Sequence, residues 1–158
     1  MTDEKRIQKA LQGLGFYSGS IDGTINSYGT RSAIKRMNAD FGTGSGSYLG
    51  PKMRNDLIFL GTLFNLDEKL IASGEGRQTR NKRLQAALTA LGFYHDRIDG
   101  VKGQATRRAI SAYKADKGAT YRTSLSFDEE YALVSQAKKM NDASIEDAIK
   151  SLKTVNSQ

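Results

Sequence analysis

The chain of 158 residues has no cysteine, no tryptophan, one histidine and one proline. Without cysteine it forms no disulfide and offers no thiolate to a metal ion. The single histidine, His95, has no second histidine with which to bind a metal, and we interpret it as a solvated loop residue. No run of about 18 apolar residues occurs, so no membrane span is expected. These absences predict a protein that needs no metal or other cofactor.

Acidic residues are in deficit, with 17 Asp and Glu against 24 Lys and Arg and a formal net charge of +7. A basic chain favours an acidic partner, which includes nucleic acid, an anionic membrane and a carboxylate-bearing cell wall. The first six residues are charged or polar, apart from Met1, and lack the apolar stretch of a secretory signal. We therefore expect no signal peptide in this sequence.

A segment near the start recurs near the middle. Leu-Gly-Phe-Tyr at 14–17, followed by Ile-Asp-Gly at 21–23, reappears 77 positions later at 91–94 and 98–100. The match also extends toward the N-terminus of each copy, where Gln8 corresponds to Gln85. After a one-residue difference in length it continues at an offset of 76 positions, where Thr-Arg-x-Ala-Ile follows the Asp-Gly dipeptide in both copies. Two copies of one structural unit are predicted.

Each copy has the pattern of three helices joined by two loops. Apolar residues at spacings of three and four predict the first helix, which Gly15 or Gly92 closes in a left-handed conformation. Thr30 and Thr106 are expected to cap the second helix. The third helix is expected to begin at Pro51 in the first copy. In the second copy it follows a capping box formed by Ser126 and Glu129.

These signals predict an all-α protein with a first unit over 1–60, a linker over 61–80 and a second unit over 81–158. Residues 57–71 are dense in apolar side chains and are expected to pack the copies together, whereas 72–76 have the composition of a flexible linker. A short C-terminal helix is expected to start at Ser144. It either docks on the second unit, which we favour, or binds a partner.

With these residues in place, each copy resembles the peptidoglycan-binding domain appended to bacterial and phage cell-wall hydrolases. The shared pattern runs from the glutamine and leucines of the first helix through Leu-Gly-Phe and Asp-Gly to Thr-Arg-x-Ala. The second copy follows it closely and includes Gly103, whereas the first has Asn26 near the expected glycine and one added residue. The resemblance implies two tandem three-helix units plus a C-terminal helix. It also implies non-catalytic binding of peptidoglycan stem peptides.

A receptor for a short peptide that carries carboxylates needs loop hydrogen-bonding groups, an aromatic wall and a cation. Tyrosines beside the Asp-Gly loop are candidate walls, the arginines candidate carboxylate partners, and the aspartates and threonines candidate hydrogen-bonding groups. The eight candidates are Tyr17, Asp22, Thr30, Arg31, Tyr94, Asp99, Thr106 and Arg107. For the aspartates and threonines we favour the alternative that they brace their own loop and helix. Phe16 and Phe93 are expected in the core, while the tyrosines and arginines are expected to reach solvent.

No catalytic constellation is visible. The glycine-rich segment 42–47 lacks the lysine of a phosphate-binding loop, and Glu129-Glu130 lies on a helix face expected to be exposed. We predict a non-enzyme whose partner is peptidoglycan, with a cell-wall hydrolase or other protein as a possible second partner. The expected location is a bacterial cell envelope or periplasm, reached with a parent protein or by a non-classical route, or a phage virion.

Two other functions stay open. The basic run at 77–83 suits nucleic acid, but the long Asp-Gly loop exceeds the tight turn of a helix-turn-helix motif, so this partner is unlikely. The other possibility is a degenerate repeat that serves as a scaffold for a protein partner.

Overall fold

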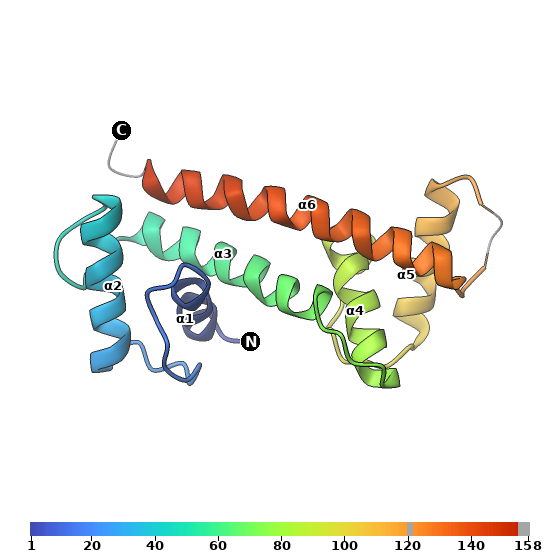
Figure 1. Cartoon of the computed structure of the whole chain (residues 1–158), viewed down its shortest axis with the longest axis horizontal. Helices are drawn as coiled ribbons and strands as arrows, with labels where there is room; N and C mark the ends of the chain where they lie inside the picture. Colours follow the sequence, from blue (N-terminus) through green and yellow to red (C-terminus); the bar gives the residue numbers. More distant parts are fainter. Residues whose placement is uncertain (120–121, 155–158) are drawn as a thin grey trace. The chain divides into compact units, whose positions relative to one another are not determined.

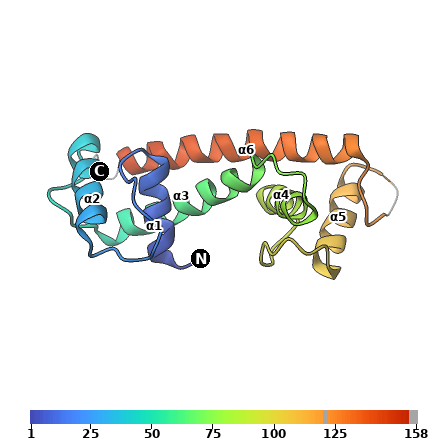
Figure 2. The same cartoon turned by 60° about the horizontal axis from the view of Figure 1, so that its bottom comes forward.

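The structure, a computed structural model, describes residues 1–119 and 122–154, and these residues form helices without a strand. Figure 1 and Figure 2 show the six helices in chain order. Their bounds are α1 Asp3–Gly13, α2 Tyr28–Phe41, α3 Pro51–Leu70, α4 Arg77–Ala90, α5 Gln104–Asp116 and α6 Phe127–Lys153. The predicted all-α class is confirmed.

The chain divides into two compact units. Unit 1 comprises Met1–Asn65 and Ala143–Gln158, and unit 2 comprises Leu66–Asp142. The predicted segment 61–80 therefore holds the end of α3, the connection to α4 and the start of α4. Both α3 and α6 supply residues to the two units, because each helix continues past a unit boundary.

The core of unit 1 combines the apolar faces of α1, α2 and α3 with the end of α6. Its centre contains Ile7, Leu11, Ile34, Leu57 and Leu152, none of which is more than 1% exposed. Helices α1 and α3 approach very closely, since a Cβ atom built on Gly61 would lie 1.9 Å from the Arg6 carbonyl oxygen. Only glycine allows this contact.

The core of unit 2 repeats this composition with α4, α5 and the first part of α6. Leu88, Ile110 and Leu133 are fully buried at its centre, and Leu66 and Leu70 of α3 add to it. The apolar residues of segment 57–71 are thus divided between two cores. The apolar faces of α2 and α5 lie in these cores, where Ala33, Ile34, Met37, Ala109, Ile110 and Tyr113 are all buried.

The first helix of each copy ends in the same way. Gly15 and Gly92 have φ angles of 88° and 86°, as predicted for a left-handed closing residue. The next N–H, on Phe16 or Phe93, donates to the carbonyl of Leu11 or Leu88 at 2.9 and 2.8 Å. This hydrogen bond and the one from the glycine N–H to the carbonyl of Gln12 or Thr89, at 3.0 and 3.1 Å, form a Schellman motif. Both phenyl rings then pack on their own core, in edge-to-face contact with Phe41 and Tyr113.

The loop before the third helix is held by a buried polar side chain in each copy. Asn38 is 1% exposed, and its Nδ2 donates to the carbonyls of Gly46 and Tyr48, both at 3.0 Å. Lys114, 76 positions later, is 5% exposed and donates from Nζ to the Ser124 carbonyl at 2.7 Å. Ser124 is itself 76 positions after Tyr48, so the two copies fix the same loop carbonyl with different side chains.

Helix α3 begins at Pro51 as predicted. The capping box before α6 is also confirmed, because the Ser126 N–H donates to Glu129 Oε1 at 2.9 Å and the Glu129 N–H donates to Ser126 Oγ at 3.2 Å.

The separate C-terminal helix predicted from Ser144 is wrong. Helix α6 runs unbroken from Phe127 to Lys153, because no glycine or proline interrupts this stretch. Its last turns do not dock on the second unit, since Ala148 and Leu152 belong to the core of unit 1. The repeat register did not show this, because the residues after 143 lie beyond the end of the internal match.

Candidate functional site

A buried glutamine organises the Asp-Gly loop of the second copy. Gln85 on α4 is fully buried, and its Nε2 lies 3.0 Å from Asp99 Oδ1, the Val101 carbonyl oxygen and Thr106 Oγ1. Its Oε1 accepts the Gly100 N–H at 2.9 Å. One side chain therefore connects the first helix, the loop and the first turn of α5. The positive φ of Gly100 lets the chain turn at this contact.

The first copy contains the same arrangement around Gln8 on α1. Its Nε2 donates to Asp22 Oδ1 at 3.0 Å, to Thr30 Oγ1 at 3.1 Å and to the Thr24 carbonyl at 3.3 Å. Its Oε1 accepts the Gly23 N–H at 2.8 Å. The extra residue and Asn26 of this loop therefore leave the central hydrogen bonds in place.

The two aspartates brace their own loops. Asp99 Oδ1 accepts the Val101 N–H at 2.9 Å, and Asp22 Oδ1 accepts the Thr24 N–H at the same distance. Hydrogen bonds from Gln85 and from the Val101 N–H lower the pKa of Asp99, and those from Gln8 and the Thr24 N–H lower the pKa of Asp22. Each carboxylate is thus held in its ionised form by the turn that it stabilises.

The two threonines are not N-caps, so that prediction is wrong. The cap of α2 is Ser27, whose side chain accepts the Thr30 N–H, and the cap of α5 is Gly103, which provides no side-chain hydrogen bond. Thr30 and Thr106 lie three residues further on, where they are 0% and 1% exposed. Their hydroxyl groups accept the glutamine amide instead, because the helices start earlier than the Thr-Arg pattern indicated.

Tyr94 does not reach solvent, which corrects the prediction of an exposed wall. Its side chain is buried at 4% exposure, and its hydroxyl donates to the Arg97 carbonyl and accepts Gln85 Nε2. Burial raises the pKa of Tyr94. Tyr17 is half-buried and its hydroxyl donates to the Ser20 carbonyl at 2.6 Å. Both hydroxyls close a short turn after the first helix.

The two arginines are exposed, as predicted, and lie on the first turns of α2 and α5. Arg107 Nη1 donates to the Lys102 carbonyl at 3.3 Å, which fixes the last part of the Asp-Gly loop. Tyr94, Asp99 and Thr106 thus meet at Gln85, while Arg107 contacts the same loop from outside. The first copy brings Asp22 and Thr30 together at Gln8 in the same way.

The sequence contained a signal for the glutamines that the site prediction did not use. Gln8 follows Ile7 and precedes Leu11 on a buried helical face, and Gln85 repeats this position. A polar residue in register on two apolar faces must satisfy its hydrogen bonds inside the protein.

Unit 2 has two concave surfaces, one of which adjoins the second loop through Lys102. One is lined by polar residues that include Arg77, Arg80, Asn81 and Lys102, and the other includes Arg83 and the aromatic residues Phe127 and Tyr131. Asn81 Nδ2 also donates to the Gly100 carbonyl at 3.0 Å, which connects the polar surface to the loop. These residues were outside the predicted site, because α6 approaches α4 only in the folded unit.

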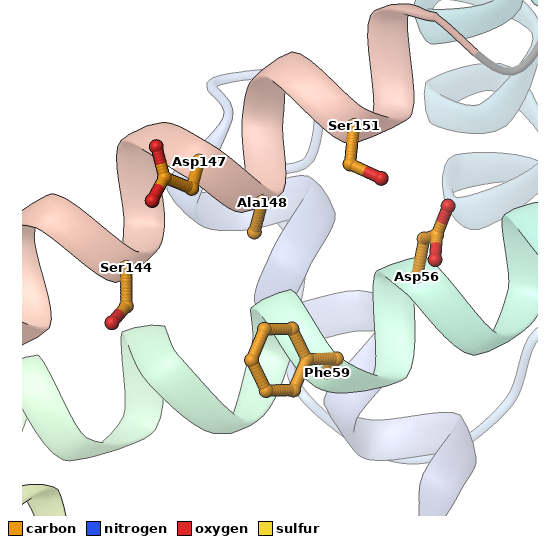
Figure 3. A pocket seen from close by; sticks show the side chains of 6 residues that line it. All are labelled: Asp56, Phe59, Ser144, Asp147, Ala148 and Ser151. Carbon is orange, nitrogen blue, oxygen red and sulfur yellow. The ribbon is translucent and has the colours of Figure 1, made fainter.

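A further pocket lies in unit 1 between α3 and α6 (Figure 3). Phe59 of α3 forms one wall and is 56% exposed, and Asp147 and Ser151 of α6 line the opposite side. Asp56 at its edge pairs with Lys52 at 2.9 Å. The carboxylates and the phenyl ring suit a cationic group rather than an anionic peptide.

Across residues 1–119 and 122–154, no group of three or more histidine, cysteine or carboxylate side chains is arranged to hold a metal ion. In the same residues, every helix is too short or too polar to cross a bilayer.

Residues 77–120 match the family model described as "Putative peptidoglycan binding domain". The matched segment covers α4, the Asp-Gly loop and α5, and so contains Gln85, Asp99 and Thr106. The predicted resemblance is confirmed for this segment. No curated protein and no solved structure matches the chain. The family match supports peptidoglycan binding in general, and the family is a non-catalytic binding domain.

Proposed function

We propose that the chain binds the stem-peptide region of bacterial peptidoglycan, without chemistry of its own, through the unit that contains residues 77–120. The family match of this segment is the observation that carries the proposal. The net charge of +7 agrees with a wall polymer that carries carboxylates.

The hydrogen bonds around Gln85 support a binding role for the loop. They fix the backbone of residues 99–101 against α4 and α5, so the loop loses little conformational entropy when a ligand binds. Residues at its exposed edge, such as Lys102 and Arg107, are then presented from a rigid base.

The finer parts of the proposal concern the whole chain. We propose that the first copy is a second module of the same kind, and that wall binding targets or anchors a wall-active protein or a phage particle. The location would then be the bacterial cell envelope or a virion. The matching hydrogen bonds of Gln8 and Gln85 support the first of these statements.

The test is retention of the full chain on insoluble peptidoglycan sacculi, at low and at roughly physiological salt, with a duplex-DNA gel shift in parallel. Retention that survives salt without a DNA shift is the expected result. Binding to both polymers that disappears with salt would show an unspecific cationic surface and refute the proposal. A specific DNA shift without retention would favour the nucleic-acid alternative, and no binding to either would favour the scaffold.

A further inference from the structure

The two concave surfaces of unit 2 adjoin each other. Both are lined by Glu75, Arg80 and Glu130, so they meet at these three residues. We call this feature the α4–α6 groove. Its floor is the first half of α4, and one wall is the start of α6.

One end of the groove carries three cationic side chains against the two carboxylates of Glu75 and Glu130. Arg77, Arg80 and Lys102 all lie on its lining and are exposed. Arg80 Nη2 is 3.8 Å from Glu130 Oε2, close to the outer limit of an ion pair, and its side chain is 53% exposed. A guanidinium held so loosely can turn toward a second carboxylate without losing a strong partner.

The other end is aromatic. Phe127 and Tyr131 are 81% and 71% exposed and lie four residues apart on α6, so they project from one face of the helix. Two large exposed rings on the same helical face form an apolar wall. On the same surface as these rings, the Arg83 guanidinium donates to the Gly74 carbonyl at 2.9 Å and holds the segment before α4 in place.

The Asp-Gly loop positions one member of the groove. Lys102 directly follows the residues that Gln85 holds, and its carbonyl accepts Arg107 Nη1. Asn81, also on the lining, holds the Gly100 carbonyl. The loop that carries the family motif thus forms part of the groove edge.

The first copy lacks these features. The positions 76 residues before Phe127 and Tyr131 are Pro51 and Asn55, so the aromatic wall is absent. The charges are also reversed, as Asp3 stands in the place of Arg80 and Arg54 in the place of Glu130.

We propose that the α4–α6 groove is where a carboxylate-bearing stem peptide binds. Arg77, Arg80 and Lys102 pair with the carboxylates, and Phe127 and Tyr131 contact the apolar part of the peptide. This inference rests on the proposed function and adds to it a location and a division of roles. It also places this groove in the second copy, since the equivalent positions of the first copy carry neither Arg80 nor the two rings.

The test uses full-chain variants on sacculi. Arg77→Gln with Arg80→Gln is expected to weaken retention about tenfold, as two charge-assisted contacts are lost. Tyr131→Ala removes part of the aromatic wall and is expected to weaken retention about threefold. All three side chains are exposed, so circular dichroism and thermal unfolding should match those of the parent chain.

Two matched controls separate the groove from general charge and surface effects. Lys35→Gln with Lys139→Gln removes the same charge from exposed positions outside the groove lining. Asn55→Ala changes the exposed first-copy position that corresponds to Tyr131. Both controls are expected to keep parental retention within about twofold.

An NMR titration of the parent chain with a synthetic stem peptide separates failure of the groove from failure of the function. The groove would be supported by shifts of the amide signals at 77–81, 102 and 127–131 that disappear when the peptide carboxylates are amidated. This would hold even if the chain were not retained on sacculi. In that case the proposed wall-binding function would fall. Two results would refute the groove as the binding site but leave the proposed peptidoglycan binding intact. The groove variants would be retained as well as the parent chain, or they would lose no more retention than the lysine control.

Discussion

Replacing Gln85 by alanine removes the side chain that joins the Asp-Gly loop to the two helices beside it. The amide nitrogen loses three contacts of 3.0 Å, to Asp99 Oδ1, the Val101 carbonyl and Thr106 Oγ1. The amide oxygen no longer accepts the Gly100 N–H. The cost depends on which of these groups can reach water after the change.

Asp99 and Val101 are exposed residues, so their oxygens can be hydrated. Gly100 and Thr106 are buried, although the Thr106 hydroxyl keeps a contact of 3.4 Å with the Val101 carbonyl. The Gly100 N–H is therefore the main unsatisfied group, at about 1–3 kcal/mol. Together with the lost contacts of the other groups, we expect a loss of about 3 kcal/mol in the free energy of unfolding. This is a large share of the roughly 5 kcal/mol available to a small unit.

The matched change in the first copy should cost less. Gly23 is half-buried, so its N–H has partial access to water after Gln8→Ala, and we expect a loss of about 2 kcal/mol. Gln85→Leu fills the volume of the side chain without its hydrogen bonds and separates the cavity from the polar effect.

Urea denaturation followed by circular dichroism measures the free energies, and hydrogen exchange by NMR reports on the Gly100 amide itself. We expect Gln85→Ala to lower the midpoint more than Gln8→Ala and to abolish protection of that amide. If Gln85→Ala stays within about 0.5 kcal/mol of the parent and the amide remains protected, the role of the glutamine is refuted.

Three further changes test other parts of the structure. The folded pKa of Asp99 lies below its unfolded value of about 3.9, so its carboxylate adds stability above roughly pH 4 that is lost as the pH falls through the folded pKa. Asp99→Asn should therefore flatten the acid limb of stability in urea titrations from pH 6 to 2, and an unchanged limb would contradict this. Gly61→Ala would place a methyl group 1.9 Å from the Arg6 carbonyl oxygen and should cost more than about 3 kcal/mol in thermal unfolding. Gly76→Ala meets nothing within 4 Å and should cost only about 1 kcal/mol, because it replaces the N-cap glycine of α4. Asn38→Ala leaves two loop carbonyls without their donor and should cost about 2 kcal/mol and speed proteolysis within 42–50, and parental resistance would argue against this role.

Local features of the fold were predictable because their causes are local. A glycine after an apolar helix, a proline at a helix start and a Ser-x-x-Glu box each act within one turn, and Gly15, Pro51 and Ser126 take the predicted roles. The repeat added register and aligned the two copies. It could not indicate how far α6 extends, because that depends on the core of unit 1 and on the absence of a helix breaker.

The site was harder to predict because its residues act through tertiary contacts. The pattern indicated Tyr94 as an exposed wall and Thr106 as a helix cap, but both side chains are buried and form hydrogen bonds with Gln85. Periodicity places Gln85 on a helical face but does not identify its hydrogen-bond partners. The residues of the α4–α6 groove carry no motif, since Arg80 and Tyr131 lie about fifty positions apart in the sequence and meet only when α4 and α6 pack.

The two copies separate the residues that brace the Asp-Gly loop from those that line the α4–α6 groove. Gln8 and Gln85 make equivalent hydrogen bonds, although the loops around them differ in length, so the shared motif is explained by the needs of the loop itself. The groove-lining residues, in contrast, differ between the copies. Arg80 and Glu130 of the second copy form an ion pair, and the first copy has Asp3 and Arg54 at these positions, so the charges are exchanged. A match to the motif therefore indicates a braced loop in both copies. The proposed groove depends instead on charged and aromatic residues of α4 and α6, and the first copy has Asp3, Pro51 and Asn55 at positions equivalent to Arg80, Phe127 and Tyr131.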